Sequence, residues 1–139
     1  MGHMSSDDIE FMKSLESGTL ANASFHHAEH VRMAFLYLCS YSAFEALQRF
    51  SSALKRFAAA NGHPERYNET ITWGFLLLIH ERMARAGRDL TWTEFAAANP
   101  DLMSWKNNVL RRYYREETLS SDLARRLFLF PDKVGGVAS

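Results

Sequence analysis

Apolar residues recur at helical spacing along almost the whole chain, and no alternating run of apolar and polar residues reaches the length of a strand. Ser, Thr or Asp precedes several periodic segments as an expected N-terminal cap, and Gly or Asn follows them as a stop. With 139 residues, 47% of them apolar, the chain is long enough to bury a sizeable core without disulfides. The sequence therefore predicts an all-α fold, a single compact bundle or array of about six to seven helices.

The caps and stops divide the chain into the expected helices. They lie at about residues 7–17, 24–40, 42–60, 65–86, 91–98, 101–113 and 121–130. Within the fourth, the stretch from Ile71 to Ile79 is apolar on every side. A helix that is apolar all round is usually surrounded by others, so the helix at about residues 65–86 is expected to be the buried centre of the fold.

The two ends of the chain are expected to lie outside the domain. Residues 1–3, Met-Gly-His, are typical of a cloning remnant, and residues 135–139 begin with a Gly-Gly pair that suggests a flexible tail. Residues 4–134 form the single expected domain. The acidic start from Ser5 to Asp8 is unlike a signal peptide.

Charge and apolar run length bear on the partners. Sixteen basic and sixteen acidic residues give a formal charge of zero, so neither nucleic acid nor a membrane surface is expected as a partner. The longest apolar stretch, residues 71–79, is far shorter than the roughly 20 residues that span a bilayer. The single cysteine, Cys39, lies among apolar neighbours, which fits an inert thiol in the reducing cytoplasm.

His27 and His30 form the strongest candidate site. They lie three residues apart in an expected helix and share its apolar face, so both imidazoles are expected to point into the core. Burial and the positive end of the helix dipole both disfavour imidazolium, so both rings should be neutral. A neutral imidazole can ligate a transition metal or accept a proton as a general base. The alternative is a pair of core histidines that are hydrogen-bonded to a carboxylate or a hydroxyl.

A polar stretch at the start of the expected central helix supplies the other candidates. It contains Tyr67, Asn68, Glu69, Thr70 and Thr72. Glu69 is a candidate third metal ligand, or the carboxylate that orients an imidazole. The other four residues are candidates for binding a small polar molecule. The alternative is that Glu69 is a favourable first-turn acid and that the threonines bond to helix carbonyls.

The C-terminal part of the chain adds one candidate side chain and one alternative role. Arg125 lies four residues after Ser121, so it can reach back into the bundle toward a carboxylate or a ligand. Aromatic residues offer a surface for a protein partner instead: Trp92, Trp105, Tyr113 and Tyr114.

Several motifs follow one another along the chain: Phe25-x-His27-x-x-His30, then Tyr67-x-Glu69-Thr70-Ile71-Thr72-Trp73, then Tyr113-Tyr114 with Thr118-Leu119-x-Ser121-x-x-Ala124-Arg125 and Pro131-Asp132. This succession resembles that of a family of small, all-helical bacterial proteins of unassigned function. The resemblance implies that the second motif acts as a unit with the two histidines, and it implies no reaction. Where the family pattern has His between Tyr and Glu, this chain has Asn68, which counts against a three-histidine metal site.

Two classes of function stay open at the level of the sequence. One is a small enzyme or metal-dependent protein acting on a small polar molecule, with His27, His30 and Glu69 as catalytic residues. In that class the same three residues could hold one divalent transition metal, such as Zn, Fe, Cu, Mn or Ni. The other is a non-catalytic module that binds a small molecule or a protein. A homodimer is compatible with both.

Overall fold

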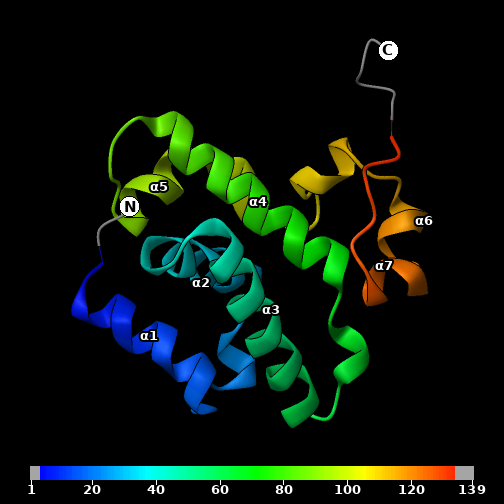
Figure 1. Ribbon diagram of the computed structural model, residues 1–139, viewed down its shortest axis with the longest axis horizontal. Helices are drawn as coiled ribbons and strands as arrows, with labels where there is room; N and C mark the ends of the chain where they lie inside the picture. Colours follow the sequence, from blue (N-terminus) through cyan, green and yellow to red (C-terminus); the bar gives the residue numbers. More distant parts are fainter. Residues whose placement is uncertain (1–3, 134–139) are drawn as a thin grey trace.

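The fold is built from α-helices joined by short turns. The computed structural model describes residues 4–133, so the expected remnant at residues 1–3 and the expected tail at 135–139 lie outside this range. The helices are α1 (Ser6–Ser17), α2 (His27–Ser40), α3 (Ala43–Ala60), α4 (Glu69–Ala86), α5 (Trp92–Ala98), α6 (Glu116–Leu119) and α7 (Asp122–Arg126) (Figure 1). Within residues 4–133 there is no strand, and the predicted all-α class is confirmed. No helix in this part of the chain combines the length and the apolar character that a membrane crossing demands.

Several helix ends are set by the local signals that the sequence shows. The Ser42 hydroxyl accepts a hydrogen bond from the backbone N–H of Glu45 (3.3 Å) at the start of α3. Thr91 and Glu94 form a reciprocal capping box at the start of α5, with distances of 3.1 and 3.0 Å. Gly87 ends α4 in the left-handed conformation, at φ 74°, which a side chain would disfavour. These boundaries match the predicted ones within one or two residues.

Three helix starts differ from the expected ones. α1 begins after Ser5, whose hydroxyl caps it, and not at either following aspartate. α2 begins after His26, because Ser24 lies in a separate short 3-10 turn. α4 begins after Asn68, since Pro64 starts only a three-residue 3-10 turn before the chain becomes extended. The first helical turn of α4 is therefore later than predicted.

The prediction of a helix over residues 101–113 is wrong. This segment contains two short 3-10 turns, Pro100–Met103 and Val109–Arg112, separated by irregular backbone. Asn108 interrupts it, because its side-chain oxygen accepts from the N–H of Leu110 (3.1 Å) and its amide nitrogen donates to the carbonyl of Trp105 (3.3 Å). Such local side-chain bonds compete with a continuous helix.

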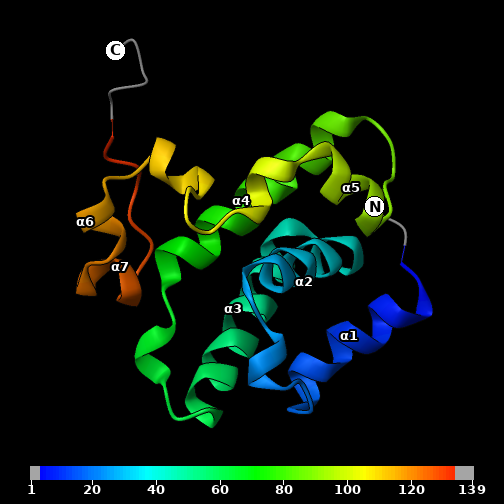
Figure 2. The same cartoon turned by 180° about the vertical axis from the view of Figure 1, so that it is seen from behind.

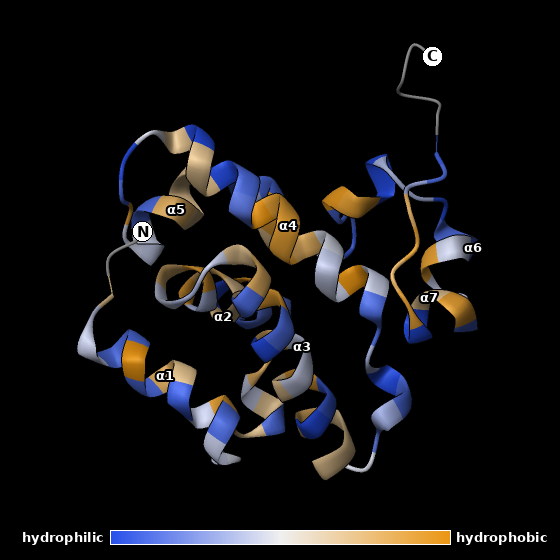
Figure 3. Cartoon of the chain, in the orientation of Figure 1, coloured by the Kyte–Doolittle hydropathy of each residue, from blue (hydrophilic) through white to orange (hydrophobic). Residues whose placement is uncertain are grey.

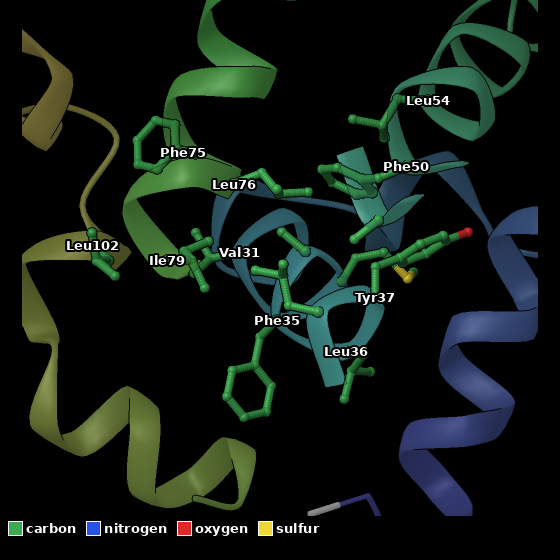
Figure 4. Close-up of a cluster of buried hydrophobic side chains, with 14 of the residues drawn as sticks. Val31, Phe35, Leu36, Tyr37, Phe50, Leu54, Phe75, Leu76, Ile79 and Leu102 are labelled. Carbon is green, nitrogen blue, oxygen red and sulfur yellow. The ribbon is translucent and has the colours of Figure 1, made fainter. Parts of the chain in front are cut away.

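The buried centre of the fold is α2, so the prediction for residues 65–86 is wrong. Every residue from Met33 to Cys39 is buried, whereas Leu77 in α4 is 40% exposed. Figure 4 shows Leu76 and Ile79 from α4 and Phe50 from α3 pointing toward α2. α4 is apolar around much of its surface because it also packs against α3, α7 and the C-terminal segment, residues 127–133. Figure 3 shows apolar bands on α3 and on the C-terminal segment. Apolar residues on several sides thus reflect several separate neighbours.

Thr70 joins the C-terminal segment to α4 by two hydrogen bonds. Its hydroxyl donates to the carbonyl of Leu127 (2.8 Å) and accepts from the backbone N–H of Leu129 (3.1 Å). Nearby, the rings of Trp73 and Phe128 stack with centroids 5.2 Å apart. The view from behind shows this segment, with α6 and α7, at the end of α4 where the helix begins (Figure 2).

Thr70→Val should lower the free energy of unfolding by about 1–3 kcal/mol, because it keeps the shape of the side chain and leaves two backbone groups without their partner. Urea denaturation measures the loss. Thr93→Val, at an exposed position in α5, is the matched control and should change stability by no more than about 0.5 kcal/mol. Equal effects of the two substitutions would contradict this role of Thr70.

Candidate functional site

A cavity of about 810 Å³ lies between α2, α3, α4 and the segment from Trp105 to Arg125. Its size falls in the range of about 300–1,000 Å³ that is usual for small-molecule sites. The buried part of its wall is largely apolar: Phe25, Val31, Ala34, Phe50, Leu54, Phe75 and Leu119. His27 and His30 interrupt this apolar wall, so the two predicted histidines lie in one cavity.

His27 is held in one orientation by the protein. Its Nε2 lies 2.9 Å from the carbonyl oxygen of Leu102, and because a carbonyl only accepts, Nε2 carries the hydrogen and donates. The ring also packs against Phe75 and Trp105, with centroid distances of 4.9 and 5.3 Å. Burial lowers the pKa of His27, and the bond to Leu102 offsets part of this effect. The ring is therefore neutral near pH 7, with an unprotonated Nδ1.

His30 is the more unusual of the two histidines. Its ring stacks on Phe25 with centroids 3.9 Å apart, and its side chain makes no hydrogen bond to any other residue within 4–133. Burial lowers the pKa of His30 to about 4, with smaller contributions from the neighbouring His27 and His26. A neutral imidazole in a cavity wall, unused by the described part of the protein, can hydrogen-bond a ligand.

Glu69 is turned toward other partners. The Tyr67 hydroxyl donates to Glu69 Oε1 (2.5 Å), and Lys55 Nζ lies 3.6 Å from the same oxygen. Burial and the bond to Glu69 raise the pKa of Tyr67, so it stays a neutral donor. The ring of Tyr67 lines the cavity, but Glu69 does not belong to its wall.

The predicted metal ligands are not brought together. Within residues 4–133, no three His, Cys, Asp or Glu side chains are placed so that they could hold one metal ion. His27 and His30 share the cavity, while Tyr67 and Lys55 hold the carboxylate of Glu69. The arrangement therefore gives no geometric support to a site made of His27, His30 and Glu69, nor to Glu69 as the group that orients an imidazole.

The other predicted binding residues divide into structural and cavity-lining groups. Asn68 caps α4 by accepting from the N–H of Ile71 (2.9 Å), and its amide donates to the carbonyl of Leu119 (2.8 Å). Both ends of that amide are thus occupied, although Asn68 borders the cavity. Thr70 is occupied by the C-terminal segment and is not part of the wall, whereas Thr72 is buried and does line it.

Arg125 lines the cavity, but it forms no ion pair with a carboxylate of the core in the described part of the chain. Its guanidinium donates to Asp122 within α7 (2.6 Å). Three further cationic side chains, Arg66, Lys106 and Arg111, also line the cavity and were missed from the sequence. They lie in or beside short turns, where residue spacing carries no information about direction.

Comparison with protein-family models, with curated proteins and with solved structures finds no match to this chain. The resemblance to small helical bacterial proteins therefore stays an expectation.

Proposed function

We propose that the protein binds a small organic molecule in the cavity beside His27 and His30. The observation that carries this proposal is the neutral imidazole of His30, which lines a cavity with a largely apolar buried wall and has no hydrogen-bond partner within the described residues. His30 and the buried Thr72 hydroxyl supply polar contacts, and the surrounding aromatic rings supply apolar area. His27 contributes Nδ1, because its Nε2 is already committed to Leu102.

The pKa of His30 favours binding over acid/base catalysis. An efficient general acid or base has a pKa near the working pH, and the pKa of His30 is lowered to about 4. His27 is oriented by the carbonyl of Leu102 and not by a carboxylate that would raise its basicity. Glu69, the predicted catalytic carboxylate, is held by Tyr67.

The placement of the four predicted aromatic residues supports a small molecule over a protein partner at those positions. Tyr114 is buried, and Trp92 packs against Phe35 with centroids 5.6 Å apart. Trp105 is half exposed, but it lines the cavity. Tyr113 remains as an exposed aromatic residue.

We place the protein in the cytoplasm, which the single buried Cys39 supports.

The test is the binding of three naphthalene probes, namely 2-naphthol, 2-naphthoate and 2-naphthylmethylammonium, measured by calorimetry. At least one probe should bind with a stoichiometry of one. Ala58 lines the cavity, and Ala58→Trp should fill part of it and weaken binding at least about tenfold. Ala59 is exposed and outside the wall, so Ala59→Trp is the matched control and should bind like the unmodified protein. Failure of all three probes, or equal binding by both variants, would overturn the proposal.

A further inference from the structure

The wall of the cavity is largely apolar where it is buried, and its exposed part includes two cations. Its buried residues include aromatic and aliphatic side chains from α2, α3 and α4. Arg66 and Lys106 are exposed and lie in two different segments, the turn before α4 and the irregular segment after Trp105. The opening therefore lies beside cations that come from separate parts of the chain.

The cations at the opening exceed the carboxylates. Arg66, Lys106, Arg111 and Arg125 line the cavity, and Glu116 is the acidic residue in its wall. Glu116 forms an ion pair with Arg111, and Asp122 forms one with Arg125.

Two of these cations lie outside any ion pair of the described residues, although Glu65 lies beside Arg66 in the chain and attracts it. Within residues 4–133, neither Arg66 nor Lys106 forms an ion pair. The chain as a whole has equal numbers of basic and acidic residues, so the positive charge here reflects placement and not composition.

We propose that the ligand is an amphipathic organic anion. Its apolar or aromatic body would lie between Phe25, Phe57 and Phe75, and its carboxylate or phosphate would lie near Arg66 and Lys106 at the opening. This inference rests on the proposed function. A cationic ligand would be repelled by the like charges at the opening, and a neutral ligand would leave both cations without an ion pair.

The interior of the cavity agrees with this orientation. The predicted site carboxylate, Glu69, is turned to Tyr67 and Lys55 and is not in the wall. His27 and His30 are neutral and add no fixed charge. His27 can accept a hydrogen bond at Nδ1, and His30 can donate or accept one. The charged end of an amphipathic anion is therefore best placed at the opening, where it also keeps part of its hydration.

The same three naphthalene probes test the charge. Near neutral pH and at low salt, 2-naphthoate should bind at least about tenfold more tightly than 2-naphthol, and 2-naphthylmethylammonium should bind least. Arg66→Gln and Lys106→Gln should each weaken 2-naphthoate about three- to tenfold and leave 2-naphthol unchanged. High salt should weaken 2-naphthoate selectively, because the cations are exposed. Lys13→Gln removes the same charge from α1, outside the cavity, and should alter neither probe.

The outcomes separate this inference from the proposed function. If 2-naphthol binds in the cavity as tightly as 2-naphthoate, or 2-naphthylmethylammonium binds more tightly than 2-naphthoate, the proposal of an anionic ligand is wrong. The proposal of small-molecule binding then stands. Equal effects of Lys13→Gln and Arg66→Gln on the affinity for 2-naphthoate would also contradict the proposed role of the cations at the opening. If no probe binds, both proposals fail. Circular dichroism of each variant establishes that a loss of binding is not a loss of fold.

Discussion

Replacing Phe35 by Ala should lower the free energy of unfolding by about 3–5 kcal/mol, since it removes a fully buried ring from the central helix. Phe35 contacts Trp92 and Phe95, with ring centroids 5.6 and 4.9 Å away, so it joins α2 to α5. Neighbouring large side chains on two helices cannot easily collapse into the space left behind. Chemical denaturation followed by circular dichroism measures the change.

Leu77→Ala is the control for Phe35→Ala. Leu77 lies in the stretch of α4 that is apolar on every side, but it is 40% exposed. Its truncation should cost less than about 1 kcal/mol. Similar losses at Phe35 and Leu77 would mean that α4, and not α2, is the centre of the core.

Stability should fall as the pH decreases from about 6.5 to about 4, by on the order of 3 kcal/mol from His30. Above pH 6.5 His30 is neutral in both the folded and unfolded states, and its full contribution is present. Between these two pH values the unfolded state binds a proton that the folded state does not, so unfolding becomes more favourable. Below the folded pKa of about 4 both states are protonated and the loss levels off.

His30→Gln separates this effect from other titrations. Urea denaturation at several pH values should give a flatter profile for the variant than for the unmodified protein between pH 6.5 and 4. Hydrogen bonds from Arg82 lower the pKa of Asp101 below 3.8, so the stability from that pair is lost at more acidic pH. Burial also lowers the pKa of His27, which leaves a smaller slope of the same sign in the variant. Parallel profiles for the two proteins would contradict the lowered pKa of His30.

The sequence predicts the class of the fold because most helix ends depend on local chemistry. Thr91 and Glu94 form their capping box from residues three apart, and Gly87 ends α4 through its own backbone preference. The position of a helix in the core depends on its neighbours instead. Ile71 to Ile79 is apolar because α4 has several different partners, which no periodicity within α4 can distinguish from burial at the centre.

The candidate site also has features that residue spacing predicts and features that it does not. The shared face of His27 and His30 follows from their spacing, and both lie in one cavity. The partner of Glu69 does not follow from spacing, because the short bond from Tyr67 depends on how the chain turns before α4. Arg66 and Lys106 lie in segments without a helical period, so only the folded chain shows that they meet at one opening.

The most direct test of small-molecule binding at this cavity is a titration with 2-naphthoate, followed by NMR of the histidine imidazoles. The resonances of His27 and His30 should shift and saturate at one equivalent, whereas that of His80, exposed on α4 and outside the cavity wall, should stay in place. The shifts should be lost in Ala58→Trp and retained in Ala59→Trp. Unmoved resonances of His27 and His30, or shifts of all histidines in parallel without saturation, would contradict the account.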